Sequence, residues 1–215
     1  MHTGTQVEHA ARERLVVDAG CGEGYYLTQL RSHLDALPLA DERFPECQFV
    51  GFDISKWAMQ LAAKRFPGTW LVASNRRIPL ADSSVDVLLD MFGFCDYAEF
   101  ARILKPGGAL IRVGAGERHL QQLRQLIYEQ QKPPKAREET SASSYFRDAF
   151  SDRLEFDIAA LPVDSLRDLL TMTPHFYRAS AAGKRRIADV ERLDLSVDVF
   201  TDILLREGSS MVAMA

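Results

Sequence analysis

A glycine-rich turn between an apolar segment and a helical segment constrains this chain most. Residues 14–18 (RLVVD) have the apolar, β-branched character of a buried strand, and Gly20, Gly22 and Gly24 follow at alternate positions. Glycine lets a backbone turn sharply and approach a ligand because no Cβ stands in the way. A helix expected from Tyr25 would present free N–H groups and a partial positive charge to this turn. The sequence therefore predicts a strand–turn–helix unit suited to binding a carboxylate.

Strand-like and helix-like segments alternate along the rest of the chain. Strands are expected at residues 14–18, 48–53, 69–73, 85–91, 109–113, 153–161 and 193–205, and helices at 25–37, 55–66, 97–104, 118–130 and from about 163. Strands separated by helices form right-handed βαβ units and a parallel sheet. We therefore expect an α/β fold with a seven-stranded, mostly parallel sheet and an antiparallel last strand.

The length and the polar segments indicate one domain. A chain of 215 residues is long enough for a single core. Residues 1–13 read as an N-terminal extension, and the polar, Pro-containing stretch at 132–147 reads as an exposed connection or lid. No segment has the apolar core of an export signal or the length of a bilayer span.

Acidic and polar residues follow the first three expected strands. Asp18 ends the first strand and could bind an ammonium group, directly or through water. Asp53 ends the second strand and could accept hydrogen bonds from both hydroxyls of a ribose, although an Asp here is also a common helix cap. Ser74 and Asn75, after the third strand, could bind an adenine amine or form a plain polar turn.

The turn distinguishes two nucleotide-binding families. The dinucleotide fingerprint G-x-G-x-x-G would need glycine at Tyr25. The observed D-x-G-x-G-x-G resembles class I S-adenosylmethionine-dependent methyltransferases. This resemblance implies their Rossmann-like fold, S-adenosyl-L-methionine (SAM) as cofactor and no catalytic metal. It places the cofactor against Asp18, Gly20, Cys21, Gly22, Gly24, Tyr25, Asp53, Ile54, Ser74 and Asn75.

Two later stretches resemble one methyltransferase family more specifically. GERHLQQLRQLIY at 116–128 and LTMTPHFYRAS at 170–180 are similar to bacterial 23S ribosomal RNA (guanine-N1)-methyltransferases. The resemblance implies ribosomal RNA as the methyl acceptor. That family also carries an N-terminal zinc module with four cysteines, which this sequence lacks. Its aromatic-small-Pro motif here reads Phe92-Gly93-Phe94, without the proline.

Candidate catalytic residues follow the fourth strand, at the edge that faces the methyl group in class I enzymes. Guanine N1 carries a proton, so a nearby base would assist its methylation. Asp90 is the first candidate and Asp96 the second, and either could instead cap the following helix.

Aromatic residues could stack on a flat base, although an aromatic cluster is often simply core. The candidate substrate residues are Phe92, Phe94, His119 and Phe176.

Composition restricts the partners. A formal net charge of −4 disfavours unaided binding to nucleic acid. The three cysteines, Cys21, Cys47 and Cys95, form no C-x-x-C pair, which disfavours a zinc ribbon or a disulfide framework and is typical of a cytoplasmic protein. Ribosomal RNA, which the resemblance implies, is still the expected partner, and the acidic charge indicates that a separate RNA-binding protein could be needed. The sequence also leaves open a small-molecule acceptor, a non-catalytic cofactor-binding role and the oligomeric state, a homodimer included.

Overall fold

The computed structural model describes residues 13–37, 47–128, 144–173 and 175–208. The chain forms two compact units. The first comprises Met1–Arg112, Glu139–Phe150 and Asp202–Ala215, and the second comprises Val113–Glu138 and Ser151–Thr201. We describe each unit by itself.

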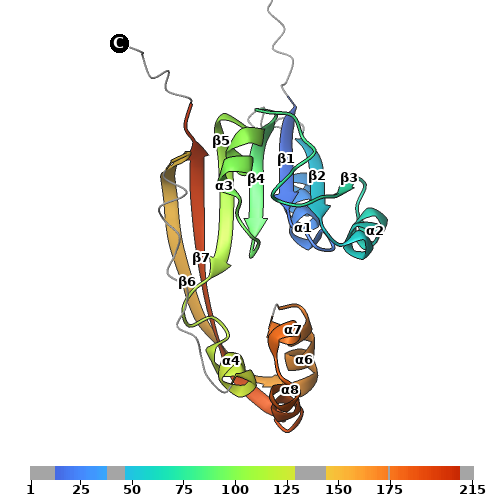
Figure 1. The fold of residues 1–215 in the computed structure, drawn as a ribbon, viewed down its shortest axis with the longest axis vertical. Coiled ribbons are helices and arrows are strands. Elements are labelled where there is room, and N and C mark those ends of the chain that lie inside the picture. Colours follow the sequence, from blue (N-terminus) through green and yellow to red (C-terminus); the bar gives the residue numbers. More distant parts are fainter. Residues whose placement is uncertain (1–12, 38–46, 129–143, 174, 209–215) are drawn as a thin grey trace, which may run out of the picture. The chain divides into compact units, whose positions relative to one another are not determined.

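Seven strands form one mixed sheet (Figure 1), and this confirms the expected α/β fold class. Their order is β3-β2-β1-β4-β5-β7-β6, with the last strands antiparallel. Strands β1, β2, β3 and β4 pair in parallel. The strands are β1 (Arg14–Ala19), β2 (Cys47–Asp53), β3 (Thr69–Val72), β4 (Val85–Met91), β5 (Leu104–Ala115), β6 (Phe146–Pro162) and β7 (Arg192–Arg206).

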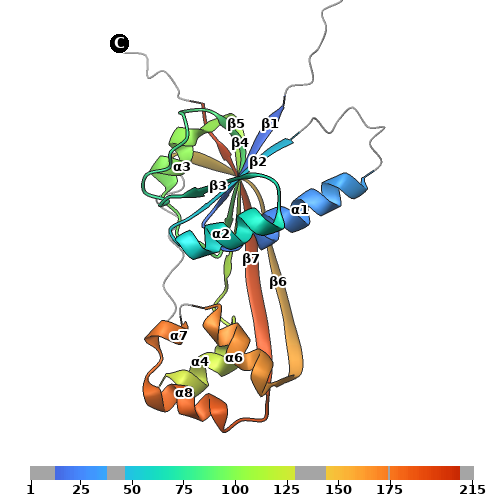
Figure 2. The same ribbon diagram turned by 90° about the vertical axis from the view of Figure 1, so that its right-hand side faces the viewer.

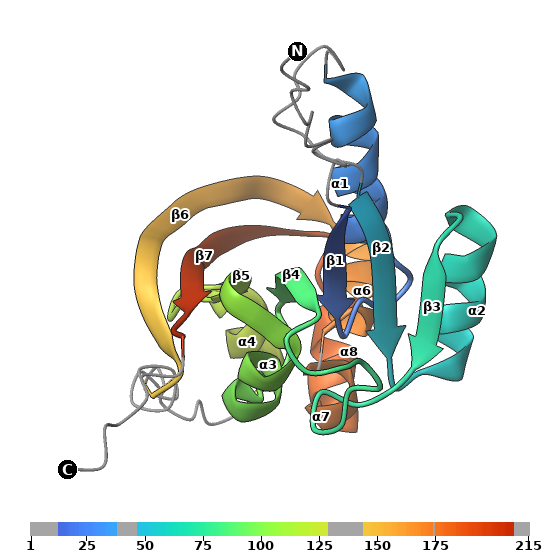
Figure 3. The ribbon, with the colours of Figure 1, turned by 90° about the horizontal axis from the view of Figure 1, so that it is seen from above.

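Helices of the first unit cover both faces of its part of the sheet. Helix α1 (Tyr25–Ala36) packs Leu27 against β1, β2 and β4 on one face, while α3 (Tyr97–Ile103) packs Phe100 and Ile103 on the other (Figure 3). Helix α2 (Lys56–Arg65) begins at Ser55, whose hydroxyl accepts a hydrogen bond from the backbone N–H of Ala58. The helix therefore begins where the sequence predicts it, with Ser55 as its N-cap.

In the described residues of the second unit, four short helices gather around a separate core (Figure 2). They are α4 (Gln121–Ile127), α6 (Val163–Thr171), α7 (His175–Arg178) and α8 (Ala181–Ala188). Leu123, Leu166, Ile187 and Leu195 are fully or almost fully buried between these helices and β7. Among the described residues, no helix is long and apolar enough to cross a membrane.

Three element boundaries differ from expectation. Strand β5 begins at Leu104 and includes the Lys-Pro-Gly-Gly turn, β6 begins at Phe146 instead of residue 153, and α4 begins at Gln121 instead of 118. Residues 146–152 are too polar to predict a strand by themselves, but they lie beside β7 in the sheet, and cross-strand pairing overrides local propensity. Phe146 and Arg147 therefore belong to β6, while residues 132–143 of the expected connection and residues 1–12 of the expected extension lie outside the described residues.

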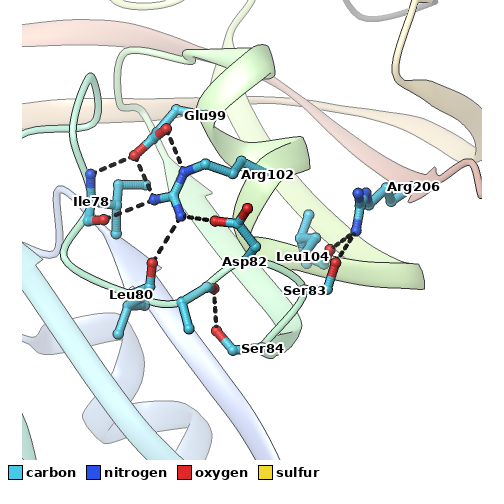
Figure 4. A network of polar contacts seen from close by, with 10 residues as sticks. Ile78, Leu80, Asp82, Ser83, Ser84, Glu99, Arg102, Leu104 and Arg206 are labelled. Atoms are coloured by element: carbon cyan, nitrogen blue, oxygen red, sulfur yellow. Dashed lines mark hydrogen bonds and ion pairs between the residues drawn. The ribbon is translucent and has the colours of Figure 1, made fainter. Parts of the chain in front are cut away.

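An arginine in α3 holds the turn between β3 and β4 (Figure 4). The Arg102 guanidinium donates to both carboxylate oxygens of Glu99 at 2.8 Å, to Asp82 at 2.6 Å, and to the backbone carbonyls of Ile78 and Leu80 at 2.9 Å each. Glu99 in turn accepts the backbone N–H of Ile78 at 2.7 Å. These bonds hold the pKa of Glu99 below its usual value.

Removing this guanidinium should destabilise the fold. We expect Arg102→Ala to lower the free energy of unfolding by about 2–3 kcal/mol, because two backbone carbonyls and two carboxylates lose charged hydrogen bonds. Arg31→Ala is the matched control. Arg31 forms an exposed ion pair with Asp35 on α1 and lies 5.6 Å from the centre of the Phe49 ring, so its loss should cost at most about 1 kcal/mol. Urea unfolding of both variants measures the difference, and equal losses would contradict a structural role for the Arg102 network.

Candidate functional site

The glycine turn after β1 adopts a backbone that requires glycine. Gly20, Gly22 and Gly24 have φ of +72°, +53° and +76°. The backbone N–H groups of Gly20 and Cys21 donate to the carbonyl of Phe52 in β2, at 2.8 and 3.0 Å. A Cβ added at Gly20 or Gly22 would meet no atom within 4 Å. The turn is therefore attached to β2 on one side and leaves open space where a ligand could approach its backbone.

Asp53 lies against this turn, as the sequence interpretation requires. One carboxylate oxygen accepts the backbone N–H of Gly22 at 3.1 Å, and the other accepts the backbone N–H of Ser55 at 2.8 Å. The two elements on which the cofactor prediction depends therefore lie on the same side of the molecule. The helix-cap alternative is also partly realised, because Asp53 and Ser55 together organise the start of α2.

Asp18 carries a fully buried carboxylate at the carboxyl end of β1. Among the residues that the structure describes, neither of its oxygens has a hydrogen-bond partner. Burial, followed by the charges of Asp90 and Asp53, raises its pKa to about 7. A buried carboxylate of this kind is costly unless a cation pairs with it. The arrangement therefore fits a positively charged ligand group at the carboxyl end of β1.

Asp90 is the penultimate residue of the neighbouring strand β4 and is also fully buried. One carboxylate oxygen accepts a hydrogen bond from Cys95 Sγ at 2.6 Å, and the other has no partner in the described part of the chain. Burial raises the pKa of Asp90, while the hydrogen bond from Cys95 and the charge of Arg112 oppose this rise. The residue that sequence analysis favoured as a base is thus a buried, electrostatically perturbed carboxylate. Such groups are common at active sites.

The remaining residues predicted to contact the cofactor differ in their surroundings. Tyr25 and Ile54 are exposed, whereas Cys21 is buried. The Ser74 hydroxyl accepts the backbone N–H of Arg76 at 3.3 Å, and the amide of Asn75 donates to the carbonyl of Phe94 at 2.6 Å. Asn75 therefore links the loop after β3 to the aromatic segment after β4.

The candidate substrate residues are distributed over both units. In the first unit, Phe92 and Phe94 are exposed, with the Arg76 guanidinium 5.6 Å from the centre of the Phe94 ring. In the second unit, the backbone N–H of Asp198 donates to His119 Nδ1 at 3.4 Å, and Lys184 lies 4.0 Å from the centre of the Phe176 ring. We therefore consider the two pairs separately.

The second catalytic candidate, Asp96, caps a helix. Its side chain accepts the backbone N–H of Glu99 at 3.1 Å at the start of α3. This is the structural alternative that the sequence left open, and a catalytic part for Asp96 remains a prediction.

Sequence analysis missed two groups of residues. In the second unit, a pocket of about 220 Å³ is lined by Arg118, Glu155, Phe156, Asp157, Ser196, Val197 and Asp198. Asp198 is buried there and pairs with the Arg153 guanidinium at 2.8 Å, and nothing in the sequence pairs these two residues. In the first unit, Trp70 packs against the glycine turn, for which a glycine in the middle of β2, Gly51, was an available signal.

The order of the strands defines a Rossmann-like domain. The glycine turn and the acidic residues at the strand ends are typical of such a domain that binds an adenosine-containing cofactor. Comparison with known proteins indicates the family. Residues 17–112, which are less than half of the chain, match the family model described as a methyltransferase domain, and in this part the chain is similar to class I SAM-dependent methyltransferases. The family has the enzyme class EC 2.1.1.-, and its cofactor is SAM.

Curated relatives include enzymes with quite different acceptors. YxjB of Bacillus subtilis (strain 168), named for 23S rRNA (guanine-N1)-methyltransferase activity, is 33% identical over 195 residues, which are 88% of this chain and 65% of that protein. Trans-aconitate 2-methyltransferase of Acidovorax sp. (strain JS42) is 28% identical over 183 residues, 79% of this chain and 62% of that protein. The chain thus spans less than two thirds of either relative.

A solved structure shares the fold. The crystal structure of a methyltransferase-like protein from Bacillus halodurans C-125 superposes with a TM-score of 0.59 at 11% identity, covering 93% of this chain and 95% of that one. At this identity, the likeness concerns the fold alone.

The residues present fit SAM. Asp18 offers two unpartnered carboxylate oxygens for the cofactor ammonium, and the backbone beside Gly20 and Gly22 is open to its carboxylate. Among the described residues, no group of three or more His, Cys, Asp or Glu side chains could hold a metal ion.

Proposed function

We propose that this protein transfers a methyl group from SAM to N1 of a guanine in 23S ribosomal RNA. The observation that carries the acceptor is the similarity to YxjB, because it extends over 88% of the chain and thus beyond the family match at residues 17–112. The stretches at 116–128 and 170–180, which resemble this family of RNA enzymes, lie outside that match.

The residues of the first unit would bind and orient the cofactor. When bound, SAM supplies a methyl group activated by its sulfonium sulfur. Asp18 would pair with the ammonium group, the backbone of the glycine turn would bind the carboxylate, and Asp53 would accept the ribose hydroxyls. Because methyl transfer is an in-line displacement, the main contribution of the protein is to align the acceptor atom with the methyl group and the sulfur of the donor.

Asp90 would accept the proton of guanine N1. Its pKa is raised by burial, which makes its carboxylate a stronger proton acceptor than a solvated one. Phe92 and Phe94, exposed just beyond Asp90, would stack on the base.

The test uses ribosomal RNA that lacks the modification. The purified protein, radiolabelled SAM and 23S rRNA from a strain in which this gene has been deleted should give labelled 1-methylguanosine, identified by mass spectrometry of nucleosides. RNA from the parent strain should accept little label. If the deletion strain retains all of its 1-methylguanosine and its RNA accepts no label, the proposed acceptor is wrong.

A small-molecule acceptor is the second candidate. The similarity to trans-aconitate 2-methyltransferase covers 79% of the chain, and a net charge of −4 disfavours binding to a polyanion. A screen of small carboxylic acids with labelled SAM distinguishes the two candidates, because methyl ester formation without any labelling of RNA supports the second.

Removing the Asp53 carboxylate should weaken cofactor binding. Asp53→Ala loses the bond to Gly22 that closes the turn and the expected bonds to the ribose, so we expect Kd for SAM to rise about 30-fold. Isothermal titration calorimetry measures this change. Asp35→Ala, on the exposed face of α1, is the matched acidic control and should bind as wild type does. A variant at residue 53 that also binds like wild type would exclude Asp53 from the cofactor site.

A further inference from the structure

Three residues form a row across neighbouring strands beneath the glycine turn. Asp18 in β1 is in register with Gly51 in β2, and Gly51 is in register with Trp70 in β3. Residues in register on paired strands project to the same face of a sheet. Trp70 is therefore separated from the Asp18 position by a residue that has no side chain.

The Trp70 indole occupies the space that the absent side chains leave. A Cβ at Gly51 would lie 2.4 and 2.6 Å from two ring carbons of Trp70, and a Cβ at Gly24 would lie 2.5 Å from a third. Among the described glycines with positive φ, Gly51 does not occur, so its backbone conformation does not require glycine. The close approach of the Trp70 ring does, because it leaves no room for a side chain. Gly24 meets both requirements, since it has a φ of +76° and lies against the ring.

The ring is fixed in this position from the other side. Trp70 Nε1 donates to the carbonyl of Phe66 at 3.1 Å, and the Phe66 ring packs edge-on against the indole with 6.0 Å between centroids. Cys21 of the turn and Met59 of α2 complete an apolar cluster against which Trp70 packs. The glycine turn thus packs against a fixed aromatic ring at Gly24, where helix α1 begins.

We propose that Trp70 is a positioning residue for the cofactor. Its indole fills the space between Gly51 and Gly24, and it thereby holds the backbone of the glycine turn in the position that binding of the methionine end of SAM requires. The same ring keeps apolar surroundings next to the Asp18 position. In this role Trp70 acts through the turn and not on the reacting groups. This inference depends on the proposed function, since it concerns the binding of the same cofactor.

A set of variants at positions 51 and 70 tests the support. Trp70→Ala removes the ring and should raise Kd for SAM at least about tenfold, whereas Trp70→Phe keeps an aromatic support and should bind within about threefold of wild type. Gly51→Ala forces the ring away and should weaken binding to a similar degree. In the double variant Gly51→Ala/Trp70→Ala the added methyl group meets no ring and Cys21 Sγ stays close to it, at 2.9 Å, so its Kd should lie within about threefold of that of Trp70→Ala.

Trp57→Ala is the control, because Trp57 is 78% exposed on α2. Kd is measured by calorimetry on protein shown to be folded by circular dichroism, with thermal melting recorded in parallel. If Trp70→Ala is unfolded, the comparison of Kd between Gly51→Ala, Trp70→Phe and wild type still tests the inference.

The outcomes separate the inference from the function on which it depends. Loss of melting temperature at unchanged Kd in Trp70→Ala, or additive effects of the two substitutions, would show that Trp70 only stabilises the fold and would overturn the inference. Failure of the wild-type protein to bind SAM would instead overturn the proposed function.

Discussion

At pH 8, Asp18→Asn should make the cofactor-free protein more stable and should nearly abolish SAM binding. In the wild type, a fully buried carboxylate without a hydrogen-bond partner must ionise next to Asp90 and Asp53. Replacing it with a neutral side chain of the same shape removes that cost, and we expect a gain of about 2–4 kcal/mol in the free energy of unfolding. Loss of the carboxylate that pairs with the ammonium should raise Kd for SAM at least about 100-fold.

The stability gain should depend on pH with a definite sign. Because the pKa of Asp18 is raised from 3.8 to about 7 in the folded protein, the folded state holds a proton that the unfolded state releases between these two values. Stability of the wild type therefore falls as pH rises through this window, and the loss is complete above about pH 7. The difference between Asp18→Asn and wild type should be small at pH 4 and should reach its plateau near pH 8.

Urea unfolding at pH 4.5, 6 and 8 measures this difference, with Asp35→Asn as an exposed control on α1. Calorimetry on the wild type adds a second reading, since an ionised Asp18 is needed for binding and Kd for SAM should rise about tenfold per pH unit below 7. A difference in stability that does not change with pH would mean that Asp18 keeps an ordinary pKa in solution.

Asp90→Asn should lower methyl transfer about 10²–10⁴-fold while leaving Kd for SAM within a few-fold of wild type. The substitution keeps the shape of a buried side chain that accepts a hydrogen bond from Cys95, but it removes the ability to accept the proton of guanine N1. The measurement is the single-turnover rate of label transfer to unmodified 23S rRNA, compared with Kd for SAM from calorimetry on the same preparation.

Asp96→Asn distinguishes the two catalytic candidates. Its side chain caps α3, so we expect a modest loss of melting temperature, and Asp35→Asn again provides the control for removal of a carboxylate. A large loss of rate in Asp96→Asn together with a normal rate in Asp90→Asn would assign the base to Asp96. Normal rates in both variants would mean that neither carboxylate acts in the chemical step.

Local patterns predicted most of the fold. Ser55 begins α2, Pro67-Gly68 follow its end, and the strands near β1, β2 and β4 lie where their apolar runs predict them. These features depend on neighbouring residues alone. The strand at residues 153–161 was predicted, but the first residues of β6, 146–152, could not be, because they are mostly charged and polar and only pairing in the sheet makes them a strand.

The candidate site shows the same division. Spacing and residue type alone determined that a turn rich in glycine joins a strand to a helix, and that an acid ends the next strand. Tertiary structure decided that Asp53 bonds to Gly22, that Asp18 and Asp90 are both buried, and that the Trp70 ring packs against Gly51 and Gly24. The physical reason is distance along the chain: parallel pairing places residues about 30 to 70 positions apart at one sheet edge, and no local preference encodes which side chains then meet there.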